Sequence, residues 1–283
     1  MAERAIIDLS DWLKTPAGCY VLQWEQAHLD TAVADLFGFH ALQLGLPELD
    51  ALRNNRMPHR WVATERAAPA SGASVKPDTE TDAAGTAAPA RTAIALHCDF
   101  DALPFDSNSL DLVVLPHALE TARDPHLALR EVERVLVPEG RVVVVGFNPA
   151  SLWGLRQGLG RWRGYITGGT RHPLFLPRAG DFMRYRRLRD WLRLLSFEVE
   201  AGRFGCYRPP VASQKWLSRF AWMERAGERW WPVFGAAYFV VAVKRVRGMR
   251  LVGLARVQNA APHAAPAPVV ATHHHHHSDH NTE

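Results

Sequence analysis

The 283 residues are 47% hydrophobic and 22% charged, which is ordinary usage for a globular protein with a sizeable core. No apolar run reaches the ~18 residues that a membrane-spanning helix needs. An acidic start with Glu3, Asp8 and Asp11 does not fit a secretory signal. The three cysteines are scattered and odd in number, which fits reduced thiols rather than disulfides or a metal site. We therefore expect a cytoplasmic protein without a bound metal.

Charge is divided unevenly along the chain. Residues 1–150 hold 12 Lys and Arg against 21 Asp and Glu, whereas residues 151–250 hold 20 against 6. This asymmetry fits an anionic partner for the basic segment 150–250, such as nucleic acid, an acidic membrane surface or a charged substrate. It fits a solvated arginine-rich surface equally well.

The first segments predict a helix followed by two strands. Residues 22–37 place apolar side chains at helical spacing, and Gly38 is placed to end that helix. The apolar run 39–44 predicts a buried strand, and a brief helix with Pro47 near its start is expected next. Residues 60–65 predict the second strand.

Two segments have the composition of unfolded chain. Residues 67–90 are almost wholly Ala, Pro, Ser, Gly, Thr and Asp, and they bury too little apolar surface to offset the entropy of ordering. We expect a disordered insert there and a disordered tail over 247–283. The tail carries five consecutive histidines, which fit either native metal-sequestering composition or an added tag.

The middle of the chain predicts a strand–helix–strand unit. Strands are expected at 93–99, 111–115 and 141–147, the last a β-branched run. Asp124 and Pro125 supply an N-cap and a first-turn proline for a helix between the second and third of these strands. A βαβ unit of this kind indicates an α/β fold with parallel strands.

Beyond residue 150 the composition becomes rich in Gly, Arg and Trp. A helix is expected near residues 188–195 and a strand at 197–201. A Trp-rich helical stretch at 214–231 precedes a final strand at 237–243.

Short motifs occur in a fixed order between residues 97 and 147. They are Asp99–Phe105, Ser109–Val114, Asp124-Pro125 and Pro138–Arg141. Together they resemble the type 11 class I methyltransferases, and the segments 37–45 and 146–156 are similar to a bacterial branch of that family. The resemblance implies a Rossmann-like seven-stranded sheet whose last strand is antiparallel, with S-adenosylmethionine bound at the carboxyl ends of the strands.

The resemblance also implies a domain organisation. Residues 1–66 and 91–246 would form one methyltransferase domain, interrupted by the 67–90 insert. Residues 150–232 would form a helical Arg/Trp-rich cap over a small-molecule or lipid-like methyl acceptor.

The chain departs from the family pattern after its first strand. Where family members carry an acidic residue and then a glycine-rich loop, this sequence has Gln43 and only one glycine, Gly45. Glycine suits that loop because the backbone passes close to the cofactor in conformations that side chains block. Pro47 also removes an N–H donor. Two readings follow: a methyltransferase with an altered loop, or a protein that keeps the fold as a binding or scaffold protein.

Four further residues are expected at the cofactor by resemblance. Glu65 would accept hydrogen bonds from the ribose hydroxyls, Asp99 would accept from the adenine amino group, and Phe100 would pack on the ring. Pro116 would lie beside them at the end of the fourth strand. The residues alone also allow a surface role for Glu65 and a turn-capping role for Asp99.

Two residues are predicted near the transferring methyl. His117 follows the fourth strand and suits a general base, because its ordinary pKa lies near neutrality. Asn148 follows the fifth strand and is placed to orient the acceptor. The alternatives are a packing or capping histidine and a turn-capping asparagine.

Overall fold

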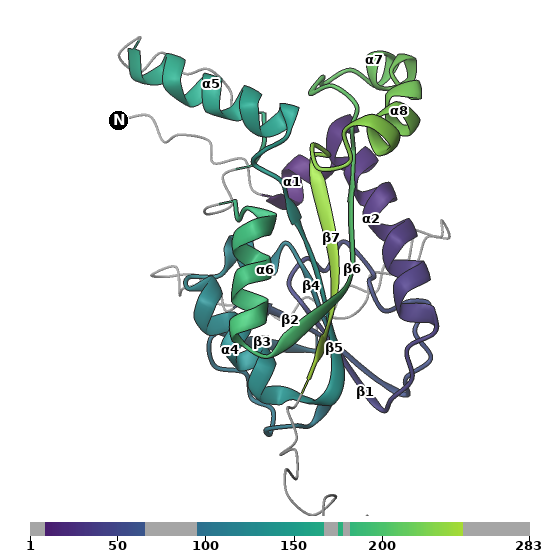
Figure 1. Ribbon diagram of the computed structural model, residues 1–283, viewed down its shortest axis with the longest axis vertical. Coiled ribbons are helices and arrows are strands. Elements are labelled where there is room, and N and C mark those ends of the chain that lie inside the picture. The colour runs from purple at the N-terminus through teal and green to yellow at the C-terminus, as the bar shows by residue number, and fades with distance from the viewer. Residues whose placement is uncertain (1–8, 66–94, 167–174, 178–181, 246–283) are drawn as a thin grey trace, which may run out of the picture. The chain divides into compact units, whose positions relative to one another are not determined.

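In the described part of the chain, seven strands form one mixed sheet in the order β3-β2-β1-β4-β5-β7-β6 (Figure 1). The computed structural model describes residues 9–65, 95–166, 175–177 and 182–245, so the predicted insert at 67–90 and tail at 247–283 lie outside the described residues. The strands are β1 His40–Leu44, β2 His59–Glu65, β3 Leu96–Cys98, β4 Leu110–Pro116, β5 Leu136–Phe147, β6 Phe197–Gly205 and β7 Ala237–Lys244. Strands β1 to β5 pair in parallel, and β7 runs antiparallel to both β5 and β6. The predicted Rossmann-like sheet with an antiparallel last strand is confirmed.

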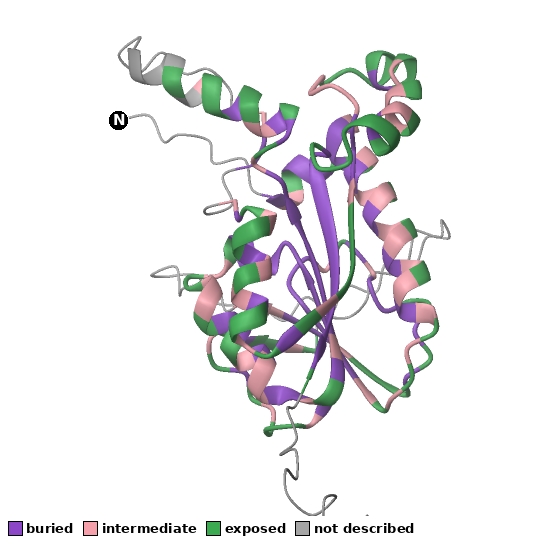
Figure 2. Cartoon of the chain, in the orientation of Figure 1, coloured by how far each residue is buried: buried purple, intermediate pink, exposed green. Residues whose placement is uncertain are grey.

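The central strands are buried on both faces (Figure 2). Every residue of β7 is buried, and so is the run 142–147 of β5. Continuous Val-rich segments fit this position because both faces of such a strand are covered, so no polar alternation is required.

Helices cover both faces of the sheet. Their bounds are α1 Leu9–Leu13, α2 Pro16–Ala34, α3 Ala118–Thr121, α4 Pro125–Val135, α5 Leu152–Ile166, α6 Tyr185–Leu194, α7 Gln214–Arg219 and α8 Trp222–Trp230. Thr15 caps α2 by accepting from the Gly18 N–H, and Asp124 caps α4 by accepting from His126 and Leu127. The predicted capping of α4 by Asp124 and Pro125 is therefore present.

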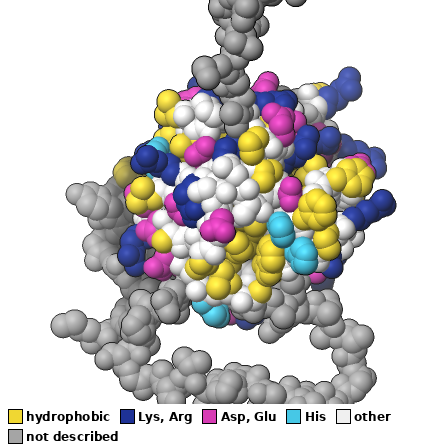
Figure 3. Space-filling model, turned by 90° about the horizontal axis from the view of Figure 1, so that it is seen from below, with side chains coloured by type: hydrophobic (Ala, Val, Ile, Leu, Met, Phe, Trp, Pro, Cys, Tyr) yellow, Lys and Arg dark blue, Asp and Glu magenta, His cyan; other side chains and the backbone are white. Residues whose placement is uncertain are grey.

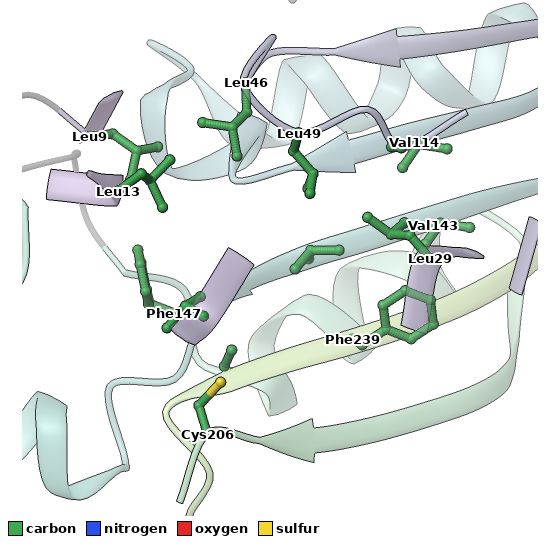
Figure 4. Packing of buried hydrophobic residues seen from close by; sticks show 14 of the residues in the cluster. Leu9, Leu13, Leu29, Leu46, Leu49, Val114, Val143, Phe147, Cys206 and Phe239 are labelled. Carbon is green, nitrogen blue, oxygen red and sulfur yellow. The ribbon is translucent and has the colours of Figure 1, made fainter. Parts of the chain in front are cut away.

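Alternate residues of each strand face two separate cores, as the two-residue period of a strand requires. On one face α1 and α2 pack against Val114, Val143 and Phe239 (Figure 4). On the other face α3, α4 and α6 pack against Val113, Val144 and neighbouring positions. Figure 1 shows α2 on one side of the sheet and α4 and α6 on the other.

The brief helix expected around Pro47 was wrong: residues 47–54 form turns. The Gln43 Nε2 donates hydrogen bonds to the carbonyl oxygens of Leu46 and Leu49. In a helix, these oxygens would accept from the backbone N–H groups four residues later.

The Trp-rich stretch predicted as helical is divided into α7 and α8. Within residues 150–232, the segment assigned to a cap, β6 joins the sheet and α6 packs beside it.

The amino-terminal ends of β1 and β2 carry a stack of three rings. His40 stacks on His59 with centroids 5.2 Å apart and on Trp61 at 5.6 Å. Seen from below, the molecule shows hydrophobic side chains beside histidines (Figure 3). This stack begins at the opposite end of β2 from Glu65.

Among the described helices, none combines the length and the apolar character that crossing a bilayer requires.

Candidate active site

The predicted cofactor residues follow strands that lie side by side. Because β1, β2, β3 and β4 are parallel, their carboxyl ends meet at one edge of the sheet. Glu65, the last residue of β2, is in register with Cys98, the last residue of β3, so Asp99 follows directly beside it. The topology therefore places two carboxylates from distant parts of the chain at one point.

A pocket at this edge brings Glu65, Asp99 and Phe100 together. Its lining consists of Glu65, Asp99, Phe100, Asp101, Ala122, Arg123 and Asp124. Phe100 is buried, whereas Asp99 is exposed. Burial raises the pKa of the Glu65 carboxyl, Arg123 opposes that shift, and the charges of Asp99 and Asp101 add to it. The pocket thus combines acidic hydrogen-bond acceptors with the apolar ring of Phe100.

The loop after β1 turns through two residues with positive φ. Gly45 has φ of 80° and Leu46 has φ of 42°. The Gly45 N–H donates to the carbonyl oxygen of Ala63 at 2.7 Å, which ties the loop to β2. A Cβ on Gly45 would lie 3.5 Å from the Ala118 Cβ, an ordinary contact, so the backbone conformation rather than crowding favours glycine.

The Gln43 side chain forms hydrogen bonds with the backbone of this loop. The side chain is fully buried, and its Nε2 donates to the carbonyl oxygens of Gly45 at 3.2 Å, Leu46 at 3.0 Å and Leu49 at 2.7 Å. Its Oε1 accepts from the Ala51 N–H at 3.0 Å. A carboxylate has no N–H to donate to those oxygens. The amide at this normally acidic position therefore matches the path of this particular loop.

The side chains of Leu46 and Leu49 point into the core on one face of the sheet, to which Leu9 and Leu13 of α1 also belong (Figure 4). They are 8% and 2% exposed. Apolar residues thus anchor a loop that is glycine-rich in the family pattern, and this burial opposes the cost of the positive φ at Leu46.

His117 is buried between two glutamates at the end of β4. Its Nε2 lies 2.8 Å from Oε1 of Glu25 in α2, and its Nδ1 lies 2.9 Å from Oε2 of Glu120 in α3. All three side chains are at most 1% exposed. Glu120 also accepts from the Phe147 N–H. The cluster therefore links α2, β4, α3 and the end of β5.

The charge state of His117 follows from these contacts. Burial lowers the pKa of the imidazole, but the charges and hydrogen bonds of Glu25 and Glu120 outweigh that effect and raise the pKa to about 10. Burial raises the pKa of Glu120, against the effect of His117 and the Phe147 N–H. An imidazolium that donates from both nitrogens has no lone pair for an incoming proton. This geometry favours a positioning role for His117 over the predicted general-base role.

Sequence reasoning missed Glu25, although the sequence carries a signal for it. Val21, Glu25 and Leu29 stand four residues apart on the buried face of α2, all at 0% exposure. A carboxylate inside such an apolar stripe needs a partner, because an unpaired buried charge is costly. Its second oxygen, Oε2, has no hydrogen-bond partner among the described residues.

Asn148 joins the end of β5 to the segment that leads into β7. Its Nδ2 donates to the carbonyl oxygens of Val233 and Gly235, both at 2.9 Å, and its Oδ1 accepts from the Ala150 N–H at 3.1 Å. The residue is 3% exposed. These contacts occupy both ends of the amide.

A family model described as a methyltransferase domain matches residues 61–144. An uncharacterized protein, YafS of Escherichia coli (strain K12), is 42% identical over 103 residues, which cover 36% of this chain and 39% of that protein. Malonyl-[acyl-carrier protein] O-methyltransferase of Halorhodospira halophila is 44% identical over 64 residues, or 23% of this chain and 21% of the relative. The chain thus spans less than half the length of these curated relatives.

A chain in the complex between the Haloferax volcanii Trm112 methyltransferase activator and its partner has a TM-score of 0.49 at 18% identity, covering 87% of this chain and 99% of that one. The matched model spans β2 to β5 and includes the residues that line the pocket of Glu65 and Asp99. The part of the chain from β2 to β5 is therefore similar to class I S-adenosylmethionine-dependent methyltransferases.

Proposed function

We propose that this protein is an S-adenosylmethionine-dependent methyltransferase that binds the adenosine end of its cofactor at Glu65 and Asp99. The observation that carries the proposal is the meeting of these two carboxylates in one pocket at the carboxyl edge of the parallel strands. Ionised carboxylates accept hydrogen bonds only, which suits ribose hydroxyls at Glu65 and the adenine amino group at Asp99. Phe100 supplies an apolar surface in the same pocket.

The methionine end of the cofactor is assigned to the adjacent strand ends. The carbonyl oxygen of Pro116 lies 3.6 Å from the position that a Cβ of Gly45 would take, so these two residues face each other across β1 and β4. When bound, the cofactor supplies a methyl group on a sulfonium, whose transfer to a nucleophilic atom leaves a neutral thioether. The protein contributes mainly orientation and approach distance to such a transfer.

In this proposal His117 and Asn148 position the elements at the carboxyl edge of the sheet. Neither of them removes a proton from the acceptor. His117 holds α2 and α3 to the end of β4, and Asn148 holds the chain before β7 to the end of β5. An acceptor with a free lone pair, or one that ionises without help, fits such a site. We assign the acceptor to small molecules or lipid-like molecules.

Calorimetric titration with S-adenosylhomocysteine, the demethylated product, tests the proposal. We expect saturable one-to-one binding that Asp99→Ala weakens by about tenfold or more, since a hydrogen bond to a charged group is lost. Asp190→Ala is the matched control, because Asp190 is exposed on α6 and does not line the pocket. Absence of binding to the folded protein would contradict the proposal and favour the scaffold reading, which the buried Gln43 network supports.

A further inference from the structure

The outward face of α8 combines tryptophan and arginine. Trp222, Arg225 and Arg229 follow the i, i+3, i+7 spacing of one helical face, and all three are exposed. The inward face is fixed, because a Cβ on Gly227 would lie 2.2 Å from the Tyr207 ring and Glu224 accepts from the Cys206 N–H at 2.9 Å. The orientation of the Trp/Arg face is therefore set by the packing of the helix.

Helix α5 presents a second such face. Leu155, Leu159 and Trp162 stand on one side at 59%, 51% and 62% exposure. The opposite side is anchored by Trp153, which donates to the Arg208 carbonyl oxygen, and by Gln157, which bonds both backbone groups of Leu176. An apolar face this exposed needs a partner, because large exposed apolar patches are uncommon on monomeric proteins.

These faces lie at the same end of the sheet as the proposed methyl-transfer site. Helix α5 follows Phe147 at the end of β5, and α7, α8 and residues 231–236 precede the start of β7, its antiparallel neighbour (Figure 1). Figure 2 shows exposed residues over the described parts of α5, α7 and α8, beyond the buried strands. We name the five exposed tryptophans Trp162, Trp216, Trp222, Trp230 and Trp231 the tryptophan rim.

The charge of the same segments is positive. Residues 148–166 hold three arginines and no acidic residue, and residues 206–236 hold five Lys and Arg against two Glu. One of those two, Glu224, is turned inward and accepts from the Tyr20 hydroxyl. An outward surface that combines tryptophan, leucine and arginine matches the interfacial zone of an anionic bilayer, where indole rings sit at the headgroups and basic side chains meet phosphate.

We propose that the tryptophan rim and the exposed leucines of α5 dock this protein on an anionic lipid surface. Exposed aliphatic side chains separate this reading from single-stranded nucleic acid, since bases stack on aromatic rings but gain no such stacking on Leu155 or Leu159. Docking at this end places the carboxyl edge of the sheet next to lipid. It is independent of whether methyl transfer occurs.

Flotation of the full chain with vesicles tests the proposal. We expect binding to phosphatidylcholine vesicles that contain phosphatidylglycerol, weaker binding without the anionic lipid, and weakening as salt rises. The variant Leu155→Ser/Leu159→Ser/Trp222→Ser is expected to lose about tenfold or more in vesicle affinity. The matched control is Phe37→Ser/Phe39→Ser, two aromatics 79% and 69% exposed just before β1, at the opposite end of the sheet.

Unfolding midpoints measured for both variants show whether a loss of affinity reflects a loss of fold. The proposal is overturned if the wild-type chain does not bind anionic vesicles. It is also overturned if the Phe37→Ser/Phe39→Ser control loses as much vesicle affinity as the α5/α8 variant. It is also overturned if Trp222→Ser weakens binding to single-stranded RNA while vesicle binding stays unchanged.

Discussion

Nε2 of His117 lies 2.8 Å from Oε1 of Glu25, although 92 residues separate the two in the chain. This contact ties the first long helix, α2, to the end of β4, and it does so inside the core. Because both partners are fully buried, neither has water as an alternative.

Removal of one partner should therefore be severe. We expect Glu25→Ala to lower the free energy of unfolding by about 3–5 kcal/mol, because it leaves a buried imidazolium with one carboxylate instead of two. Glu25→Gln, which keeps a hydrogen-bond acceptor, should cost less. Urea denaturation followed by circular dichroism measures both, and a loss below about 1 kcal/mol for Glu25→Ala would contradict the assigned ion pair.

The same cluster predicts how stability depends on pH. The folded pKa of His117 is about 10 against an ordinary value of 6.5, so its contribution is complete below pH 6.5 and disappears as the pH rises through 10. We expect the free energy of unfolding to fall between pH 7 and 10 in the wild-type protein. The variant His117→Gln should be less stable at pH 6 and nearly flat over that window. His126→Gln, in α4, serves as the control and should keep the wild-type slope.

An acidic residue at position 43, as in the pattern of the methyltransferases that the sequence resembles, should destabilise this chain. In Gln43→Glu the donating Nε2 becomes an oxygen that faces three carbonyl oxygens, so we expect a loss of at least about 2 kcal/mol in unfolding free energy. Gln214→Glu, an exposed change at the start of α7, controls for the added charge. A Gln43→Glu protein as stable as the wild type would show that the loop has an alternative path.

Glu65 should make cofactor affinity sensitive to acid. Burial raises the pKa of this carboxyl, so it takes up a proton at a higher pH than an exposed glutamate and then loses acceptor capacity. We expect S-adenosylhomocysteine affinity to fall on acidification, and Glu65→Gln to weaken it about tenfold at pH 7 and to flatten the profile. Glu228→Gln, exposed on α8, is the control. Wild-type affinity and pH profile in Glu65→Gln would show that Glu65 is not the residue that contacts the ribose.

The sheet was largely readable from the sequence because its signals are local. The Val-rich run of β5, the apolar β4 and the Asp124-Pro125 start of α4 each specify their element within a few residues. Glu65 and Asp99 were predicted from the resemblance, and the register of β2 with β3 places them together. Whether they bind the cofactor remains a prediction.

What the sequence did not reveal depends on contacts between distant residues or on side chains that compete with the backbone. The Glu25–His117–Glu120 cluster forms only when α2 reaches the end of β4, and no spacing between neighbouring residues encodes that meeting. Turns follow Gly45 where a helix was predicted, because the side-chain amide of Gln43 donates to carbonyl oxygens that would accept backbone N–H groups in a helix.

The place of β7 in the sheet has a consequence for biosynthesis. Residues 237–244 lie between β5 and β6 in space although both of those strands precede them in the chain. As the chain leaves the ribosome, β5 and β6 therefore have no shared partner until residue 244 has emerged, and each exposes an open hydrogen-bonding edge. The nascent protein depends on its last described strand to complete the sheet. A stop codon just before residue 237 would therefore release an incomplete, aggregation-prone sheet in place of a shortened but folded protein.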